Sequence, residues 1–366
     1  MRPRTRSSVP YLQRVLFATM LESSTEKPVI RVAVFSAQPH DKHFFNCVNQ
    51  ECFQSLHAEL VFHTSPLSKE TAALAGRCDA VCVFVNDCVD EDVLQLLLDQ
   101  GVRGVFLRCA GFNNVDLKAA KKLGLFVARV PAYSPEAVAE FAVALILTLN
   151  RRTHRAYNRV REGNFDLSSL LGFNMHGKTV GIVGVGKIGL AAARIFKGFG
   201  CNLLAYDPYE VDEFKALGAY TTFENLLQQS DIVTLHCPLL VSTKHLISRA
   251  SLMNLKWGAM LINTSRGGII DTAAVIDALK SGQIGALGLD VYEKEAGLFF
   301  VDHSSDIIHD DVFQRLLTFP NVLVTGHQAF LTGEALTEIA ETTLQNLQHF
   351  AHGTACSNAL VGGDAI

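Results

Sequence analysis

The sequence predicts an α/β fold with two doubly wound parallel sheets, in which one domain is inserted into the chain of the other. Short apolar runs alternate with helix-compatible segments over most of the 366 residues, a pattern typical of parallel strands covered by helices on both faces. A glycine-rich turn of the kind that follows the first strand of such a domain occurs only at residues 184–189. A separate βα domain is therefore expected before it.

The first domain is expected to comprise residues 30–131 and 331–366. Its strands are predicted at residues 30–35, 81–85, 104–107 and 125–127, with a helical segment at 68–76. The tail from Thr332 has the pattern of a single helix. This helix could bring the end of the chain back to the first domain.

The second domain is expected to span residues 132–330. Pro131 and Pro135 mark the crossover into it. Ser134 is suited to cap an apolar helix that runs to Leu149, with Pro135 at its first position. The strands of this domain are predicted at residues 179–183, 202–206, 232–235, 259–263, 285–289 and 322–324.

The glycine-rich turn follows the first strand of the second domain and has the chemistry of a pyrophosphate site. Gly184 permits a tight turn, Gly186 lets a phosphate approach the backbone, and Gly189 lets the next helix pack closely against the strand. Lys187 and Ile188 lie at the start of that helix, whose N-terminus offers unpaired N–H groups to an anion. The turn therefore predicts dinucleotide binding.

Asp207 follows the next strand, where a carboxylate can accept hydrogen bonds from the hydroxyls of an adenosine ribose. A 2′-phosphate on that ribose would be repelled by Asp207 and would need a nearby cation. Pro208, Tyr209 and Glu210 follow instead. The predicted cofactor is therefore NAD and not NADP.

Composition excludes several other classes of protein. The chain is 49% hydrophobic and 19% charged with a net charge of −4, so an ordinary globular protein is expected and a nucleic-acid partner is not. Arg151, Arg155 and Arg159 fall on one helix face, which is more typical of a solvated or subunit-contacting face than of a phosphate-backbone site. The nine cysteines include no Cys-x-x-Cys pair, and the apolar run 141–149 is too short to span a bilayer. Reduced thiols, no metal site and no membrane span are expected.

Residues 1–29 differ from the rest, because four arginines precede the first acidic residue, Glu22. This composition is typical of an organellar transit peptide, so import into mitochondria or plastids is one interpretation. The alternatives are a disordered extension or a true start at Met20. The cytoplasm is the leading expectation.

Three polar side chains stand at or just beyond predicted strand ends of the second domain, where ligands bind in such sheets. Arg266 follows strand 259–263, Glu295 lies five residues after Asp290, and His327 follows the last strand. Arg266 can hold a carboxylate in a bidentate fork. His327 can give a proton to a carbonyl oxygen as hydride reaches the carbon, and Glu295 can orient and stabilise the protonated imidazole. Together these residues predict the reduction of a 2-oxo acid.

From about residue 30 to its end the chain resembles the D-isomer-specific 2-hydroxyacid dehydrogenases. The matching runs are LRCAGFNNVD (107–116), RVPAYSPEAVAE (129–140), LHCPL (235–239), NTSRGG (263–268), DVYEKE (290–295) and TGHQAFLT (325–332). The resemblance implies a substrate domain split around the NAD-binding domain. It also implies that Arg266, Glu295 and His327 are the catalytic residues.

The resemblance adds further site residues. Around the cofactor it implies His236, Cys237, Pro238, Asn263, Thr264 and Asp290, the last near the nicotinamide. Phe330 is expected to line the substrate pocket, and Asn86 is assigned to the same pocket. The long segment between Glu295 and His327 favours the branch that converts pyruvate to D-lactate.

The predicted function is thus that of an NAD-dependent D-lactate dehydrogenase acting on a small 2-oxo or 2-hydroxy acid, as a homodimer or homotetramer. One alternative is the same chemistry on a larger 2-oxo acid, such as phenylpyruvate. An alternative of another class is an NAD(H)-sensing corepressor, which can share this fold and the three catalytic residue types. Such proteins usually carry a polar C-terminal tail, and only a few residues follow the last predicted helix here.

Overall fold

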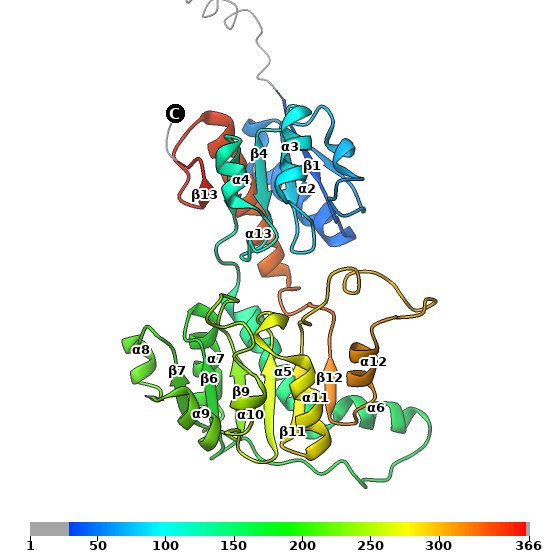
Figure 1. Cartoon of the computed structure of the whole chain (residues 1–366), viewed down its shortest axis with the longest axis vertical. Coiled ribbons are helices and arrows are strands. Elements are labelled where there is room, and N and C mark those ends of the chain that lie inside the picture. Colours follow the sequence, from blue (N-terminus) through cyan, green and yellow to red (C-terminus); the bar gives the residue numbers. More distant parts are fainter. Residues whose placement is uncertain (1–28, 364–366) are drawn as a thin grey trace, which may run out of the picture. The chain divides into compact units, whose positions relative to one another are not determined.

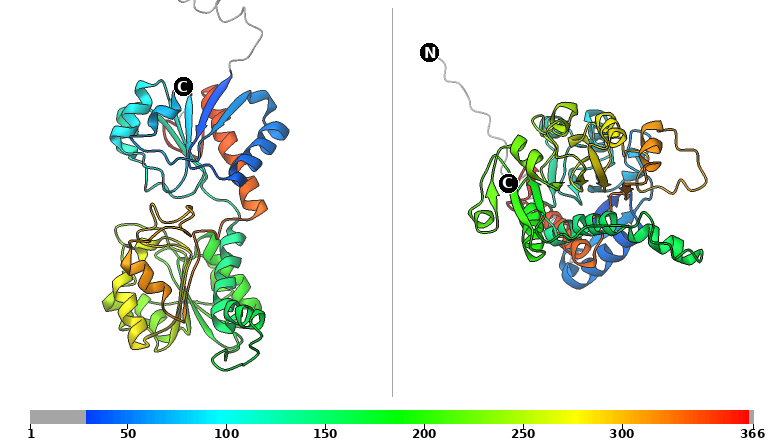
Figure 2. Two further views of the ribbon diagram at one scale, coloured as in Figure 1. Left: turned by 90° about the vertical axis from the view of Figure 1, so that its right-hand side faces the viewer. Right: turned by 90° about the horizontal axis from the view of Figure 1, so that it is seen from below.

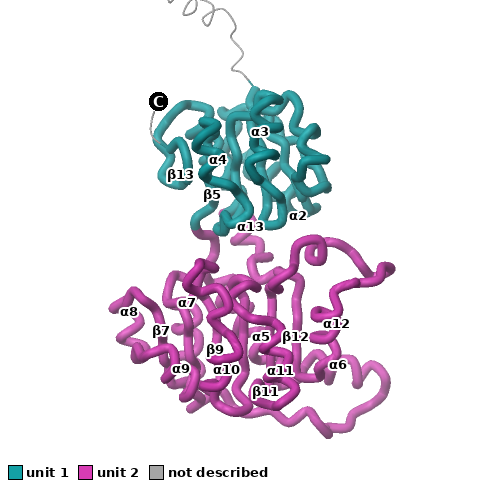
Figure 3. The backbone as a smooth tube through the Cα atoms, viewed as in Figure 1, with its two compact units in different colours: residues 1–131, 339–366 teal, residues 132–338 magenta. Residues whose placement is uncertain are grey.

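The computed structural model describes residues 29–363. The described chain divides into two compact units, one formed by residues up to 131 and from 339 onward, the other by residues 132–338 (Figure 3). The interpretations of the N-terminal extension, as a transit peptide or as the region of an alternative start, fall on residues outside the described range.

Unit 1 contains a six-stranded sheet in the order β13-β5-β4-β3-β1-β2. Its strands are β1 (Ile30–Val34), β2 (Ala58–Phe62), β3 (Ala80–Val83), β4 (Gly104–Leu107), β5 (Phe126–Arg129) and β13 (Ala359–Val361). All neighbours are parallel except β13, which pairs antiparallel with β5 at one edge. The order of the parallel strands is that of a doubly wound α/β sheet.

Helices cover both faces of this sheet. They are α2 (Pro39–Cys52), α3 (Glu91–Asp99), α4 (Leu117–Lys122) and α13 (Gly333–His352), most of which belongs to unit 1. α3 and α4 lie on one face, and α2 and α13 on the other (Figures 1 and 2). Alternate residues of β3 follow this division, because Val81 and Val83 pack with α3 whereas Cys82 lies near Phe45 of α2 and Leu344 of α13.

Unit 2 contains a parallel seven-stranded sheet in the order β12-β11-β10-β9-β6-β7-β8. Its strands are β6 (Thr179–Val183), β7 (Asn202–Tyr206), β8 (Ala219–Tyr220), β9 (Ile232–Leu235), β10 (Ala259–Asn263), β11 (Ile284–Leu289) and β12 (Val322–Val324). The first strand, β6, lies between β7 and β9, so the chain reverses direction across the sheet at β6. This reversal point is where open α/β sheets bind ligands.

The helices of unit 2 also form two layers. They are α5 (Pro135–Arg151), α6 (Thr153–Arg161), α7 (Lys187–Gly198), α8 (Asp212–Lys215), α9 (Phe223–Gln229), α10 (Arg249–Leu252), α11 (Thr272–Ser281) and α12 (Asp311–Leu317). α5 and α7 pack together on one face, and α9 to α12 cover the other (Figure 2). Ser134 caps α5, since its hydroxyl accepts a hydrogen bond of 3.3 Å from the Ala137 N–H.

The prediction of two doubly wound α/β domains is confirmed, and the predicted strands match observed ones within one or two residues. The helix predicted at 68–76 is wrong, because only a 3-10 turn at Ala72–Ala75 forms there. The Thr71 hydroxyl donates to the Pro66 carbonyl and accepts from the Ser68 N–H, which favours a local turn over a longer helix. Strands β2, β8 and β13 and helix α12 were not predicted.

None of the helices within residues 29–363 is long and apolar enough to cross a bilayer.

Two glycines of α7 provide a direct test of the close helix–turn packing. A Cβ at Gly189 would lie 2.0 Å from the Gly184 carbonyl oxygen, whereas a Cβ at Gly198 would meet nothing within 4 Å. We expect Gly189→Ala to lower the free energy of unfolding by about 1–3 kcal/mol or more through overpacking. Gly198→Ala should leave stability unchanged or raise it slightly. Thermal unfolding followed by circular dichroism measures both, and equal midpoints for the two variants would contradict this packing.

Candidate active site

The glycine turn between β6 and α7 is shaped to accept a phosphate. Gly184 has a left-handed backbone with φ of 92°, and a Cβ there would lie 2.7 Å from the Cys237 backbone nitrogen. At Gly186 a Cβ would meet nothing within 4 Å, so the turn is open at this point. The N–H groups of Lys187 and Ile188, in the first turn of α7, have no acceptor within the helix. These residues fit the pyrophosphate of a dinucleotide.

Asp207 follows β7 and faces back to the glycine turn. One carboxylate oxygen accepts a hydrogen bond of 2.7 Å from the Val185 N–H, and the other accepts one of 2.8 Å from the Tyr209 N–H. These bonds fix the orientation of the carboxylate next to the open turn. Each oxygen keeps a further lone pair, which can accept from a ribose hydroxyl.

Two polar atoms at the ends of β9 and β10 are buried and have no hydrogen-bond partner among residues 29–363. They are Nδ1 of His236 and Oγ1 of Thr264. Nε2 of His236 lies 3.0 Å from the Thr234 hydroxyl, and burial lowers the pKa of this imidazole to about 4, so it is neutral. Because unpaired buried polar atoms cost free energy, both atoms fit a site that a polar cofactor completes.

Cys237 and Pro238 continue the chain from His236. Burial raises the pKa of the Cys237 thiol to about 11, so it is a neutral packed group and not a nucleophile. Its backbone carbonyl accepts a hydrogen bond from the Ser265 hydroxyl, which ties the end of β9 to the turn after β10. Pro238 is exposed beside it.

Asn263 shapes the turn that carries Arg266. Its side-chain amide donates to the Arg266 carbonyl at 2.9 Å, and its oxygen accepts from the Ser265 N–H at 3.0 Å. Arg266 is half-buried and donates through Nη1 to the Ser265 carbonyl at 2.7 Å. Asn263 is fully buried, and both ends of its amide are used by the turn.

Gly267 brings this turn against the loop that follows β11. A Cβ at Gly267 would lie only 2.0 Å from the Tyr292 carbonyl carbon. The Tyr292 N–H donates to Oε2 of Glu295 at 3.1 Å. The turn of Arg266 and the loop of Glu295 are therefore packed backbone to backbone, at the carboxyl ends of β10 and β11.

His327 and Glu295 form a direct pair. Nδ1 of His327 lies 2.9 Å from Oε1 of Glu295. His327 is 9% exposed, has a left-handed backbone with φ of 57°, and stacks at a tilt on Phe300 with ring centroids 5.6 Å apart. Within residues 29–363 the other ring nitrogen, Nε2, has no hydrogen-bond partner, so it can exchange a proton with a ligand.

Asp290, the residue after β11, holds the loop on which His327 lies. Its carboxylate accepts hydrogen bonds from the Thr325 hydroxyl at 2.6 Å, the Gln328 N–H at 2.9 Å and the Ala329 N–H at 2.8 Å. Asp290 is fully buried, and this burial raises the pKa of its carboxyl although the three donors favour the charged form. The hydrogen bonds of Asp290 therefore fix the conformation of the loop 325–329.

The two residues assigned to the substrate pocket lie in different units. Phe330 belongs to unit 2, is nearly buried, and meets the ring of Tyr133 edge-on at a centroid distance of 6.4 Å. Asn86 belongs to unit 1, in a turn after β3 that is closed by a hydrogen bond from the Asp87 N–H to the Phe84 carbonyl. Their participation in one pocket stays a prediction.

Sequence reasoning missed several side-chain contacts around the site. Thr325 binds Asp290, and the Tyr292 hydroxyl donates to Asp310 at 2.8 Å, which anchors the long segment before α12. Nε2 of His245 lies 2.6 Å from Oε1 of Glu293. Of these residues, only Thr325 could have been found from the sequence, because it directly follows the last strand and precedes Gly326 and His327.

Comparisons with known proteins place the chain in a family. The sequence profile described as "D-isomer specific 2-hydroxyacid dehydrogenase, NAD binding domain" matches residues 143–329. The chain belongs to this family. It is 59% identical to 2-hydroxyacid dehydrogenase A of Aspergillus oryzae, over 91% of this chain and 95% of that protein. It is 53% identical to the D-lactate dehydrogenase of Escherichia coli, over 91% of this chain and 100% of that one.

Solved structures agree with this assignment. The apo-structure of the Escherichia coli D-lactate dehydrogenase superposes with a TM-score of 0.82 at 51% identity, over 91% of this chain and 100% of that one. A structure described as the pyruvate reductase of Chlamydomonas reinhardtii gives a TM-score of 0.83 at 50% identity, over 88% and 96%. The predictions of family, two-domain α/β fold and NAD as cofactor are confirmed. The chain is an NAD-dependent oxidoreductase.

No disulfide joins the nine cysteines, all of which lie within the described residues. In the same part of the chain, no group of three or more histidine, cysteine and acidic side chains could hold a metal ion.

The pairing of His327 with Glu295 predicts a loss of turnover when the glutamate loses its charge. Glu295→Gln keeps the size of the side chain but removes the charge that faces Nδ1 of His327 and stabilises a positive charge on the ring. The kcat for NADH-dependent reduction of a 2-oxo acid should therefore fall by about tenfold or more, while NADH binding stays nearly unchanged.

Glu293→Gln is the matched control, because Glu293 pairs with His245 and Thr272 instead. Its kcat should stay close to that of the unmodified enzyme. His327→Ala should slow both directions by about 10²- to 10⁴-fold. An unchanged kcat in Glu295→Gln would remove this glutamate from its role.

Proposed function

We propose that this enzyme is a D-lactate dehydrogenase that reversibly reduces pyruvate to D-lactate. The observation that carries the proposal is the His327–Glu295 pair, with Nδ1 bound to the carboxylate at 2.9 Å and Nε2 left for the substrate. Relatives named D-lactate dehydrogenase at 58% and 53% identity support the choice of substrate. When bound, NADH supplies the hydride.

The chain's own residues divide the remaining work. Arg266 binds the substrate carboxylate and polarises the carbonyl group, for which its planar guanidinium is suited. Nε2 of His327 donates its proton to the carbonyl oxygen as the carbon is reduced, and takes it back in the oxidation. Glu295 stabilises the imidazolium, and Phe330 limits the space beyond the third carbon of the substrate.

The cofactor site that we propose is built on the glycine turn and the neighbouring strand ends. Gly186, Lys187 and Ile188 bind the pyrophosphate, Gly184 and Gly189 shape the turn that presents them, and Asp207 binds the adenosine ribose. The segment from His236 to Pro238, together with Thr264, lines the nicotinamide side. Asn263 and Asp290 act there as positioning residues through their turn and loop.

A panel of 2-oxo acids tests the substrate. With NADH we expect pyruvate to be used with a higher kcat/KM than phenylpyruvate or branched 2-oxo acids, and the product to be D-lactate by chiral chromatography. NADPH should be a far poorer cofactor because Asp207 repels its 2′-phosphate. Phe330→Ala should lower kcat/KM for pyruvate and relatively favour the larger acids.

Arg266→Lys tests the substrate-binding role of Arg266. It keeps the positive charge but loses the planar guanidinium, which can bind a carboxylate through two hydrogen bonds. It should raise the KM for pyruvate and lower kcat while leaving NADH binding nearly unchanged. A preference of the unmodified enzyme for phenylpyruvate, or an L-product, would overturn the proposed function.

We also propose that the enzyme forms a homodimer, or a homotetramer made of two such dimers, through the segment 157–173 of unit 2. This segment exposes a series of large apolar side chains: Tyr157 at 60%, Val160 at 51%, Phe165 at 72%, Leu167 at 79% and Leu171 at 90%. Exposed apolar side chains gathered in one segment are typical of an interaction surface, and a second copy offers the same surface.

The assembly is tested by the double variant Leu167→Asp with Leu171→Asp. Introducing two charges into the buried interface should shift the mass measured by light scattering toward the monomer. Met253→Asp is the control, because Met253 is 81% exposed on α10's end, outside this segment. A monomeric unmodified protein would contradict the proposed interface.

For the location in the cell we infer the cytoplasm, where fermentation usually takes place. The arginine-rich composition of residues 1–29 supports import into mitochondria or plastids as the alternative.

A further inference from the structure

A tight turn after β11 brings two side chains of unit 2 to His327. It begins at Glu295 and ends at Phe300. The N–H groups of Leu298 and Phe299 both donate to the Glu295 carbonyl at 3.0 Å, which closes the turn. The Glu295 carboxylate meets Nδ1 of His327, and the ring of Phe300 packs against the same imidazole. The proposed function assigns a role to the carboxylate and none to the ring.

Phe300 holds its ring against the imidazole from an unfavourable backbone conformation. The ring centroids of Phe300 and His327 are 5.6 Å apart with a tilt of 40°, which is within the range of attractive aromatic contacts. Phe300 has φ of 67°, a left-handed conformation that is uncommon for a bulky side chain. Such strain persists only where the surrounding structure imposes it, and it occurs most often at functional sites.

Contacts of the preceding residue impose the path of this turn. Phe299 is 7% exposed, and its ring meets that of Phe313 edge-on at a centroid distance of 5.9 Å. Phe313 also contacts the ring of Tyr292 at 5.1 Å, and the Tyr292 hydroxyl donates to Asp310, the N-cap of α12. Phe299 therefore fixes the turn to the core of unit 2, whereas Phe300 lies at the border of that core and contacts His327.

We propose that Phe300 is a positioning residue for the proton transfer, an inference that rests on the catalytic role proposed for His327. Its ring fixes the imidazole in the orientation in which Nδ1 faces Glu295 and Nε2 is left for the substrate. It also covers part of the pair against water, and a charge interaction is stronger where water is excluded. Phe300 acts through His327 and contacts no reacting atom.

Phe300→Leu tests this role, because it removes the planar ring and keeps an apolar side chain. The kcat for pyruvate reduction should fall by about fivefold or more, since a less well oriented imidazole transfers its proton more slowly. The KM for NADH should stay within about twofold. Phe300→Tyr keeps a ring at this position and should keep kcat within about twofold.

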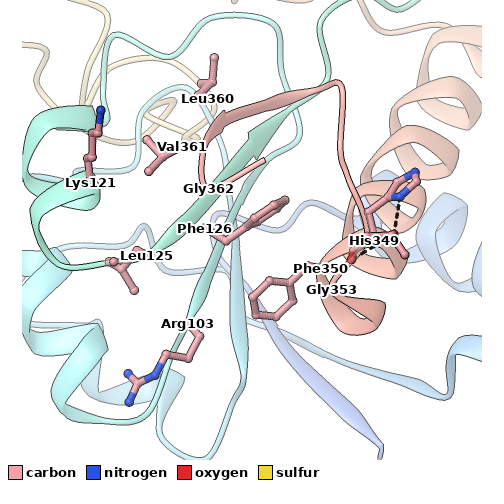
Figure 4. Close-up of a pocket in the computed structure, with 12 residues that line it drawn as sticks. Arg103, Lys121, Leu125, Phe126, His349, Phe350, Gly353, Leu360, Val361 and Gly362 are labelled. Atoms are coloured by element: carbon pink, nitrogen blue, oxygen red, sulfur yellow. Dashed lines mark hydrogen bonds between the residues drawn. The ribbon is translucent and has the colours of Figure 1, made fainter. Parts of the chain in front are cut away.

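Phe350→Leu is the matched control. Phe350 of α13 is partly buried, as Phe300 is, and its ring meets that of Phe126 with nearly the same geometry, at a centroid distance of 5.3 Å and a tilt of 42° (Figure 4). The two rings border a hollow of about 680 Å³ in unit 1 that none of the residues assigned to the proposed site lines. Phe350→Leu should therefore lower the thermal midpoint, measured by circular dichroism, and keep kcat within about twofold.

A double-mutant cycle shows whether Phe300 acts through His327. In the His327→Ala background, Phe300→Leu should lower kcat by less than about twofold further, because the group that the ring positions is then absent. A side chain that only stabilised the fold would lower kcat by the same factor in both backgrounds.

Four results would overturn the inference. They are an unchanged kcat in Phe300→Leu, an equal loss in Phe300→Tyr, an equal loss in Phe350→Leu, and an equally large effect of Phe300→Leu in the His327→Ala background. A failure of the proposed function would be seen separately, as an unchanged kcat in His327→Ala or as a preference of the unmodified enzyme for another 2-oxo acid.

Discussion

The buried carboxylate of Asp290 is the group on which the catalytic geometry depends. It stands at the end of β11 and binds one hydroxyl and two backbone N–H groups of the loop that follows β12. Leaving such donors buried and unpaired would cost about 1–3 kcal/mol each, so the loop follows the path that the carboxylate dictates. His327 lies within this loop in a left-handed conformation. His327, the proposed proton donor, is thus held by its backbone on one side and by Glu295 on the other.

Unit 1 has a corresponding buried aspartate at the carboxyl end of its own sheet. Asp87 is buried and accepts hydrogen bonds from the Ser36 hydroxyl at 2.6 Å and from the N–H groups of Leu67 and Phe84 at 2.8 and 2.6 Å. Burial raises the pKa of Asp87 as it does that of Asp290. In each unit one aspartate therefore joins the loops that leave separate strands, and Asn86 lies in a turn fixed in this way.

The two ends of the unit 1 sheet have different chemistry. At the carboxyl end, Arg108 is buried and its Nε lies 3.2 Å from Oδ1 of Asp41, so the cation is neutralised inside the fold. At the opposite end, Arg103 and Lys121 are exposed and form no ion pair within residues 29–363. Removing one partner of the buried pair would leave an uncompensated charge inside the fold, whereas the exposed cations are solvated.

Much of this protein follows from short-range patterns in the sequence. Apolar runs of four to six residues fix most of the parallel strands, and the spacing of Gly184, Gly186 and Gly189 ahead of Asp207 fixes the cofactor, because each requirement acts over a few residues of backbone. Arg266, Glu295 and His327 could also be proposed from the sequence, since ligands of parallel sheets meet at strand ends.

Tertiary structure decided the rest. Thr325, Asn263 and Asp290 fix the conformation of turns and loops through hydrogen bonds. Such bonds produce no periodic pattern in the sequence, so these roles could not be predicted from it. The edge strand β13 is only three residues long and pairs with β5 across more than 200 residues of chain. The segment 68–76 has helical composition, yet the hydrogen bonds of Thr71 select a turn. The aromatic cluster of unit 1 brings Phe106 and Phe126 to Phe350, which is far from them in the sequence. The sequence by itself thus determined what local backbone geometry and hydrophobic periodicity can encode, whereas contacts between distant segments were decided only when the chain folded.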